Sequence, residues 1–189
     1  MATLCGWAGS QTPTPDETLN RMAATTAVYP DPVTARSVAG DSALAVATAR
    51  PQPDALLEDD GVLLAVAGSP HFQDPALNAT ARAKGVAATL AAELRRLGPA
   101  LLEKLGGSYA LAWIDSRRNE TILAVDRTGS HPLSFFFEQG RLVFGSSATA
   151  LAVHPAVTNE LDWQQILNYT YFHMVPAPAT VFRHRRRLT

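Results

Sequence analysis

The chain of 189 residues is long enough to bury one substantial core, and its length favours a single domain. Its 16 Lys and Arg residues nearly balance its 17 Asp and Glu residues, and the formal net charge of −1 offers no field that would gather nucleic acid or an anionic membrane. No run approaches the roughly 18 to 20 apolar residues of a membrane helix. We therefore expect neither a nucleic-acid nor a membrane partner.

The cysteine and histidine content bears on compartment and metal binding. Cys5 is the single cysteine, which excludes an internal disulfide, and the first residues lack the basic and long apolar segments of a secretory signal. These features predict a cytoplasmic location. The 5 histidines are dispersed without metal-ligand spacing, so no metal is expected in this domain.

Short apolar runs separated by turn residues dominate the chain, and they predict strands. In chain order the runs are 3–8, 43–49, 62–67, 109–114, 121–125, 133–137 and 142–144. Turn residues at 116–119 and at 138–140 each join two neighbouring runs in the manner of a hairpin. We therefore expect adjacent strands to be antiparallel.

Four helices are predicted between the strands, at 16–24, 83–97, 147–153 and 162–171. The second has an apolar stripe at helical spacing, with Arg95 and Arg96 outside the stripe. Asp162 is suited to cap the free amides that begin the fourth helix. Helices that interrupt a strand-rich chain without regular alternation favour an α+β fold over a parallel doubly wound one.

Four motifs in the second half of the chain occur in a particular order. They read LGGSYALAWID at 105–115, DRTGSHPL at 126–133, GRLVFGSS at 140–147 and VPAPATVF at 175–182. Each motif alone is a common strand or turn pattern, but the four in series resemble the amino-terminal, glutaminase-type part of the asparagine synthetase family. The motifs themselves carry turns and core packing, not chemistry.

The resemblance implies a fold and a partner. Members of the family have an Ntn-hydrolase domain, an αββα sandwich of two mainly antiparallel sheets flanked by helices. By similarity, residues 1–182 form this class II glutamine amidotransferase domain, and 183–189 begin a linker. The family's ATP-pyrophosphatase synthetase domain is absent from this chain, so that domain is expected in cis or as a separate subunit. ATP and Mg²⁺ are implied for that domain, and no cofactor for this one.

Cys5 opens the segment CGWAG at 5–9, which resembles the family's opening C-G-I-A-G. In the family this cysteine is the first residue of the mature protein, and its thiol is the nucleophile, with the α-amine as general base. Cys5 would act in this way only if it were amino-terminal, through removal of the four preceding residues or through a true start at Leu4. The alternative is a small buried strand residue.

Arg50 and Gly68 match two further positions of the family's site. Arg50 ends a predicted strand where the family places the arginine that holds the substrate α-carboxylate by a two-pronged hydrogen bond. Its alternative role is a solvent-exposed arginine before Pro51. The family's oxyanion pair Asn-Gly corresponds to Ala67-Gly68, so Gly68 can offer its N–H while Ala67 has no side-chain donor.

Two other segments of the family's site are altered. The R-H-R-G-P-D loop is replaced by YPDP at 29–32. The turn whose Asp binds the substrate amine reads RAKGV at 82–86 and has no carboxylate. β-Lactam synthetases and lasso peptide cyclases, which resemble this family, keep such a domain as a degenerate scaffold.

These features predict a crippled or non-catalytic glutaminase-like domain that helps to shape an ATP-dependent amide-forming partner. Two other functions remain open. The domain would release ammonia from glutamine if Cys5 were amino-terminal. It would otherwise be a stand-alone ligand-binding or interaction module.

Overall fold

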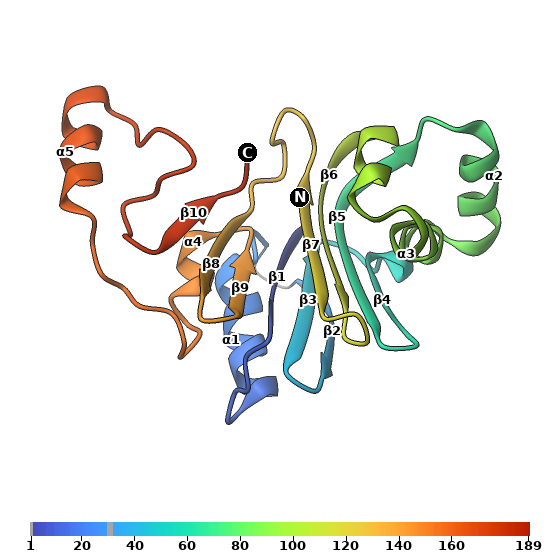
Figure 1. Ribbon diagram of the computed structural model, residues 1–189, viewed down its shortest axis with the longest axis horizontal. Coiled ribbons are helices and arrows are strands. Elements are labelled where there is room, and N and C mark those ends of the chain that lie inside the picture. Colours follow the sequence, from blue (N-terminus) through green and yellow to red (C-terminus); the bar gives the residue numbers. More distant parts are fainter. Residues whose placement is uncertain (1, 30–31) are drawn as a thin grey trace.

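The computed structural model describes residues 2–29 and 32–189, in which two antiparallel sheets stack face to face (Figure 1). The first sheet has the order β10-β8-β9-β1-β3-β2 and the second has the order β4-β5-β6-β7. The strands of the first sheet are β1 (Thr3–Ala8), β2 (Val33–Ala39), β3 (Ser42–Thr48), β8 (Ser134–Glu138), β9 (Arg141–Gly145) and β10 (Arg185–Arg187). Those of the second are β4 (Leu56–Asp59), β5 (Val62–Phe72), β6 (Leu105–Asp115) and β7 (Glu120–Val125).

Helices cover the outer face of each sheet and complete four layers (Figure 1). The first sheet carries α1 (Pro15–Thr26) and α4 (Ala148–Leu151), and the second carries α2 (Pro75–Lys84) and α3 (Val86–Leu97). Short 3-10 turns, η1 (Pro53–Ala55) and η2 (Gly98–Lys104), connect strands and helices, and α5 (Trp163–Phe172) stands away from the sandwich. The predicted α+β, αββα architecture is therefore confirmed. None of the helices within the described ranges is both long and apolar enough to cross a bilayer.

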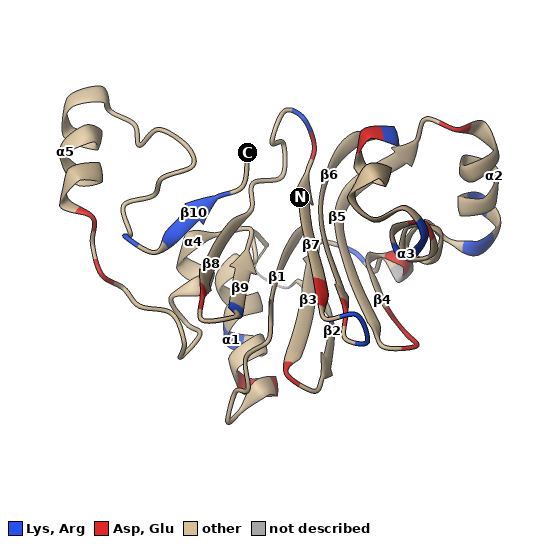
Figure 2. Ribbon diagram, viewed as in Figure 1, with Lys and Arg blue, Asp and Glu red and all other residues tan. Residues whose placement is uncertain are grey.

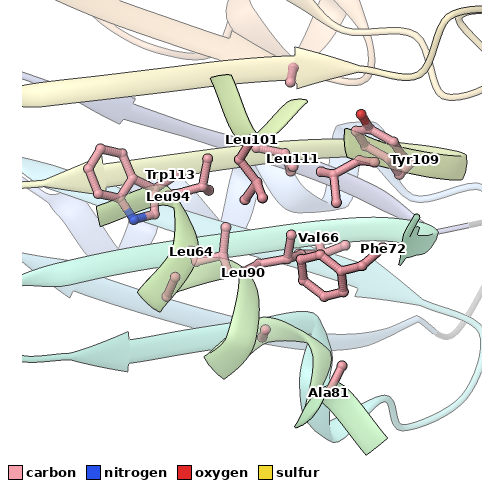
Figure 3. Close-up of a cluster of buried hydrophobic side chains, with 14 of the residues drawn as sticks. Leu64, Val66, Phe72, Ala81, Leu90, Leu94, Leu101, Tyr109, Leu111 and Trp113 are labelled. Atoms are coloured by element: carbon pink, nitrogen blue, oxygen red, sulfur yellow. The ribbon is translucent and has the colours of Figure 1, made fainter. Parts of the chain in front are cut away.

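The core is divided by the sheets into three layers of packed side chains. Beneath α3 the residues are large, and Trp113, Leu90 and Phe72 are all nearly completely buried (Figure 3). Between the sheets the alanines 65, 67, 110 and 112 are all fully buried, and the same layer holds the larger side chains of Leu44, Ile114 and Phe144. Small and large side chains together fill the space between the sheets.

All seven predicted strands are confirmed, and the hairpins at 116–119 and 138–140 join antiparallel pairs. Asp162 caps α5 as expected, because its carboxylate accepts hydrogen bonds from the N–H groups of Gln164 and Gln165.

The helix expected at 83–97 is shorter at its start, and a separate helix precedes it. Gly85 lies between them with φ of 95°, a conformation in which the α2 helix cannot continue into α3. The additional helix α2 begins at Pro75, and the Asp74 side chain caps it by accepting from Ala76 N–H. Strands β2 and β4 were not predicted either, because their sequences alternate little and leave several residues exposed.

The basic segment at the end of the chain is partly internal. Strand β10, blue in Figure 2, pairs with β8. Arg185 is fully buried, donates hydrogen bonds to the carbonyl groups of Ala148 and Thr158, and lies 3.8 Å from the ring centre of Phe182. Arg183 pairs with Glu160. These contacts tie the terminal segment to the sandwich, so only part of its charge faces solvent.

Candidate functional site

A pocket of about 310 Å³ lies where the ends of β1, β3 and β5 meet. Its lining residues come from four separate parts of the chain and are Ala2, Thr48, Ala49, Arg50, Gln52, Gly68, Ser69 and His131. An adjoining hollow of about 320 Å³ shares Gln52, Gly68 and Ser69 with it and adds Asp54. The fold thus brings the two predicted binding residues, Arg50 and Gly68, to one place.

Gly68 has a backbone conformation that no other residue would adopt easily. Its φ is 100°, and a Cβ atom at this position would collide with the carbonyl oxygen of Ser108. Both features require glycine. Glycine at position 68 therefore determines the backbone conformation of β5 where the strand borders the pocket.

The hydrogen-bonding pattern of the second sheet directs the Gly68 N–H away from β6. Tyr109, the residue opposite, uses both of its backbone groups on Asp126: its N–H donates to Oδ2 at 3.1 Å, and its carbonyl accepts from Asp126 N–H at 2.9 Å. In an antiparallel ladder, the residue opposite then turns its own N–H to the other side. Phe72, four residues along β5, does so and donates to Asn78. Since β4 pairs with β5 only as far as Ala65, the Gly68 N–H is free of a strand partner.

Arg50 follows the end of β3 and is exposed to solvent. The Thr48 hydroxyl donates to the Arg50 carbonyl at 2.7 Å and so fixes the backbone that carries it. Among the described residues its guanidinium group makes no ion pair within the protein. A free guanidinium beside a pocket is suited to binding a carboxylate.

Cys5 lies on the other side of β1 from the inter-sheet layer. Its side chain is fully buried in the cluster beneath α1, with Leu19 and Met22, whereas the preceding Leu4 faces the second sheet. Burial raises the pKa of the Cys5 thiol to about 12, an effect only partly offset by hydrogen bonding with Thr26. Cys5 does not line the pocket that contains Arg50 and Gly68.

The residues flanking Cys5 hold it within the sheet. Thr3 and Leu4 pair with Ala47 and Val46 of β3, and Leu4 N–H donates to the Ser146 hydroxyl at 3.0 Å. Leu4 is fully buried. The segment before Cys5 is therefore part of the packed structure, apart from Met1, which lies outside the described residues.

The altered positions also have defined surroundings. Ala67 is fully buried between the sheets and offers no side-chain donor. Gly85 lies beside Asp54, because a Cβ atom on Gly85 would come within 2.9 Å of Asp54 Oδ1. Of the substituted loop YPDP, Pro30 and Asp31 lie outside the described residues.

The turn at 126–133 is held by one carboxylate. Asp126 accepts hydrogen bonds from the hydroxyl groups of Thr128 and Ser130 and from several backbone N–H groups. These bonds, above all that from the Thr128 hydroxyl, keep the pKa of Asp126 far below its usual range. A larger hollow of about 500 Å³ borders Asp126 but contains none of the predicted site residues. This motif therefore shapes the loop that carries His131.

Comparison with known protein families shows to which family the chain belongs. The sequence profile described as a glutamine amidotransferase domain matches residues 73–189, which is more than half of the chain. The chain belongs to the glutamine amidotransferase domain family. The matched range includes the motifs at 105–115, 126–133, 140–147 and 175–182. A comparison with curated protein sequences gives no match.

Solved structures of other enzymes share the fold of this glutamine amidotransferase domain. One is glutamine phosphoribosylpyrophosphate amidotransferase from B. subtilis, with a TM-score of 0.54 and 17% identity over 81% of this chain and 43% of that one. Another is an allosteric regulatory enzyme of purine biosynthesis, with a TM-score of 0.53 and 16% identity over 80% of this chain and 43% of that one. The chain spans less than half the length of either.

Two polar residues of the site were not identified from the sequence. His131 was treated as one of several dispersed histidines, and Asp54 was not considered. Both lie outside the predicted strands, His131 between β7 and β8 and Asp54 in η1. No local pattern marks them, because only the packing of the two sheets brings them to Gly68.

Proposed function

We propose that this amidotransferase domain acts as a scaffold in an asparagine-synthetase-type enzyme that forms amide bonds with ATP, and that it does not hydrolyse glutamine at an appreciable rate. The observation that carries the proposal is the separation of Cys5 from the pocket that holds Arg50 and Gly68. A glutaminase needs its thiol beside the carboxamide carbon that the other residues position.

The state of the thiol supports the same conclusion. A cysteine attacks as its thiolate, and a pKa of about 12 leaves about one thiol in 100,000 ionised at pH 7. No solvent reaches the side chain. Removal of residues 1–4 to free the Cys5 amine would also remove the buried Leu4 and its pairing with Val46.

The oxyanion position is weakened independently. Gly68 N–H is free of a strand partner, but Ala67 cannot provide the second donor. Loss of one such donor typically costs about 100-fold to 1000-fold in rate. The position of the nucleophile away from the pocket and the incomplete oxyanion site together support a structural, non-catalytic role for the domain.

The surface of α5 supports a partner domain. No residue of α5 is buried, and large apolar side chains are exposed on and around it: Leu161, Trp163, Leu167, Tyr169, Tyr171, Phe172 and Met174. An apolar patch of this kind usually marks a protein interface. Since this chain covers only 43% of each chain of similar fold, we assign this surface to an ATP-pyrophosphatase domain, either fused or separate, which would bind ATP and Mg²⁺.

The first experiment measures glutamate release from glutamine by the purified protein and by Cys5→Ala. We expect both to release glutamate at the background rate. Release by the wild-type protein that the substitution abolishes would refute the proposal and favour an active glutaminase.

The second experiment tests the scaffold role. The partner is sought in the continuation of the reading frame or in the neighbouring gene, and pyrophosphate release from ATP reports its activity. We expect Trp163→Ser with Tyr171→Ser to lower that activity at least about 10-fold by weakening the interface, and Arg21→Ser, which changes an exposed residue of α1, to leave it unchanged. Equal activity of the two variants would contradict the assignment of the surface.

A further inference from the structure

Strand β7 forms a free edge of the second sheet. It stands at the end of the order β4-β5-β6-β7 and pairs with β6 alone. Beside this strand the Asp126 N–H donates to the Tyr109 carbonyl at 2.9 Å, and successive residues of an antiparallel strand turn their backbone groups to opposite sides. Thr121, Leu123 and Val125 therefore direct their N–H and C=O groups away from β6. No backbone hydrogen bond reaches these groups within the part of the chain that the structure describes.

The sequence of β7 lacks the features that protect the other sheet edges. Among the described strands, β10 consists of three arginines (Figure 2), β2 contains Arg36, and the short β4 ends in Glu58 and Asp59. Strand β7 reads ETILAV and has one charge, at its first position. Exposed edges usually carry charges, prolines or bulges, because an unprotected edge pairs with other chains. Strand β7 is therefore suited to permanent cover by another strand.

A groove begins where β7 ends. This is the hollow of about 500 Å³ that is bordered by β6, β7, η2 and the last two residues of the chain. Its apolar wall consists of Leu102, Leu105, Leu123 and Leu188. Because Leu123 belongs to this wall and to the free edge, the groove and the edge form one surface. Strand addition of this kind gains affinity from main-chain hydrogen bonds and specificity from a pocket for a side chain.

The charges at this end of β7 are basic. Arg127 lines the groove, is exposed, and makes no ion pair among the described residues. The adjacent Asp126 is not available to it, because both carboxylate oxygens accept hydrogen bonds from nearby hydroxyl and N–H groups. Arg186 and Arg187, which precede Leu188, are also exposed and without an ion pair in the described ranges. This surface suits an acidic residue on the added strand.

A second copy of this chain fits the edge poorly. Two-fold pairing that used all three outward residues would place Thr121 opposite Val125 and Leu123 opposite itself. The same register would place Glu120 opposite Asp126 at both ends of the pairing. Hydrogen bonds keep the pKa of Asp126 far below its usual range, so both carboxylates would be charged, and like charges directly opposite are destabilising. The geometry therefore favours a strand of different sequence.

We infer that β7 binds an extended segment of the ATP-pyrophosphatase partner as a fifth strand of the second sheet. The inference rests on the proposed function, which supplies that partner. Thr121, Leu123 and Val125 bond the backbone of the segment, the groove takes one of its apolar side chains, and Arg127 pairs with one of its carboxylates. Thr189 also lines the groove, so a partner joined to it would start beside this edge. The partner then holds the domain at two surfaces, α5 and β7.

The test is amide hydrogen exchange measured by NMR. The chain alone is compared with its complex with the partner, or with the fused protein where the reading frame continues. We expect the amides of Thr121, Leu123 and Val125 to exchange at least about 10-fold more slowly when the partner is present. Ile122 and Ala124, whose N–H groups face β6, are internal controls and should be protected in both samples. Protection of alternate residues is specific to an added strand.

Two variants test the contacts in the same complex. Thr121→Pro removes an outward N–H and leaves the pairing with β6 intact, so it should lower the protection of Leu123 and Val125 about 10-fold, whereas Thr121→Ala should not. Unchanged protection of the residues that face β6 shows that the proline variant is folded. Arg127→Gln should lower the protection about 3-fold, and Arg82→Gln, which changes an exposed arginine of α2, should leave it unchanged.

Three results would separate the outcomes. A complex in which the three amides exchange as fast as in the chain alone would overturn the inference and leave the proposed function standing. Protection of these amides in the chain alone that increases with its concentration would assign the edge to a second copy and would also overturn the inference. Release of glutamate that depends on Cys5 would instead refute the proposed function, without changing the pattern of exchange along β7.

Discussion

The pocket at Gly68 and the cluster around Cys5 both lie near strand β1. Polar groups are exposed in the pocket, whereas the thiol in the cluster is buried. At the pocket, Arg50 makes no ion pair among the described residues, and the Gly68 N–H has no strand partner in that part of the chain. Around Cys5, the thiol is enclosed by apolar residues of α1 and β9 and is kept protonated. Under the proposed function, the domain thus keeps the groups expected to bind exposed and encloses the group expected to react.

If the proposed function is right, the comparison implies that binding groups and reactive groups can be lost separately. A binding group needs only to be exposed at the right place, whereas a nucleophile also needs an ionised form and a path to its substrate. The following predictions test the contrast between the two regions, from the largest expected effect to the smallest.

Gly68→Ala should destabilise the protein most strongly. The positive φ and the collision with the Ser108 carbonyl together should lower the free energy of unfolding by about 3 kcal/mol. Gly40→Ala is the matched control, because Gly40 also has a positive φ of 61° but no atom near its Cβ position, and it should cost about 1 kcal/mol. Urea denaturation measures both. Equal losses would mean that the pocket wall is less tightly packed than described.

The enclosed thiol should make stability fall at alkaline pH. The pKa of Cys5 is about 12 in the folded state, against 9.0 for the free group, so the unfolded chain loses its proton first as pH rises above 9. The folded state therefore loses relative stability, by roughly 2 kcal/mol at pH 10.5. Unfolding of the wild-type protein and of Cys5→Ala is compared at pH 8 and pH 10.5. An equal loss of stability between pH 8 and pH 10.5 in the two proteins would show that the thiol is accessible to solvent in the folded state.

Protonation of His154, which lies in the same region, should lower the stability of the protein at acid pH. His154 packs 5.0 Å from Trp7, is 1% exposed, and burial together with the charge of Arg141 lowers its pKa to about 4. Because the unfolded histidine binds a proton near pH 6.5, stability is complete above that pH and falls as the pH decreases toward 4.

Between pH 7 and pH 5.5 this loss should be roughly 1 kcal/mol. His154→Asn should not show this pH-dependent loss of stability. Thermal unfolding of both proteins at the two pH values measures the loss. An identical pH dependence in the variant would assign the effect to other groups.

Substitution on α5 should have the smallest effect on stability. Trp163 is 71% exposed, so Trp163→Ser should change the free energy of unfolding of this chain by less than about 0.5 kcal/mol. Trp7→Ser, a buried change in the Cys5 cluster, should cost several times more. A loss above about 1 kcal/mol for Trp163→Ser would show that α5 packs on this domain and not on a partner.

Much of the fold could be predicted because its central strands are short apolar runs with clear turns between them. The runs that became β1, β3, β5, β6, β7, β8 and β9 all carried this signal. Edge strands β2 and β4 did not, because one or both of their faces meet solvent. Helix α2 was not predicted, although Asp74-Pro75 is a typical helix start.

Two residues of the candidate site could be assigned because each lies in a segment that resembles the family's motifs. Arg50 follows β3, Gly68 lies within β5, and both line the same pocket. His131 and Asp54 could not be assigned, because their role depends on contacts between segments distant in sequence. The burial of Cys5 was one of two roles left open, since a strand pattern does not tell which face its cysteine takes.

The alanine-rich layer between the sheets bears on whether the lost chemistry could return. Ala67 is fully buried there, opposite Ala110 of β6. Replacing Ala67 with asparagine would bury a larger and polar amide, and the neighbouring side chains would have to move to accept it. Under the proposed function, a second oxyanion donor at this position would therefore require further substitutions around it.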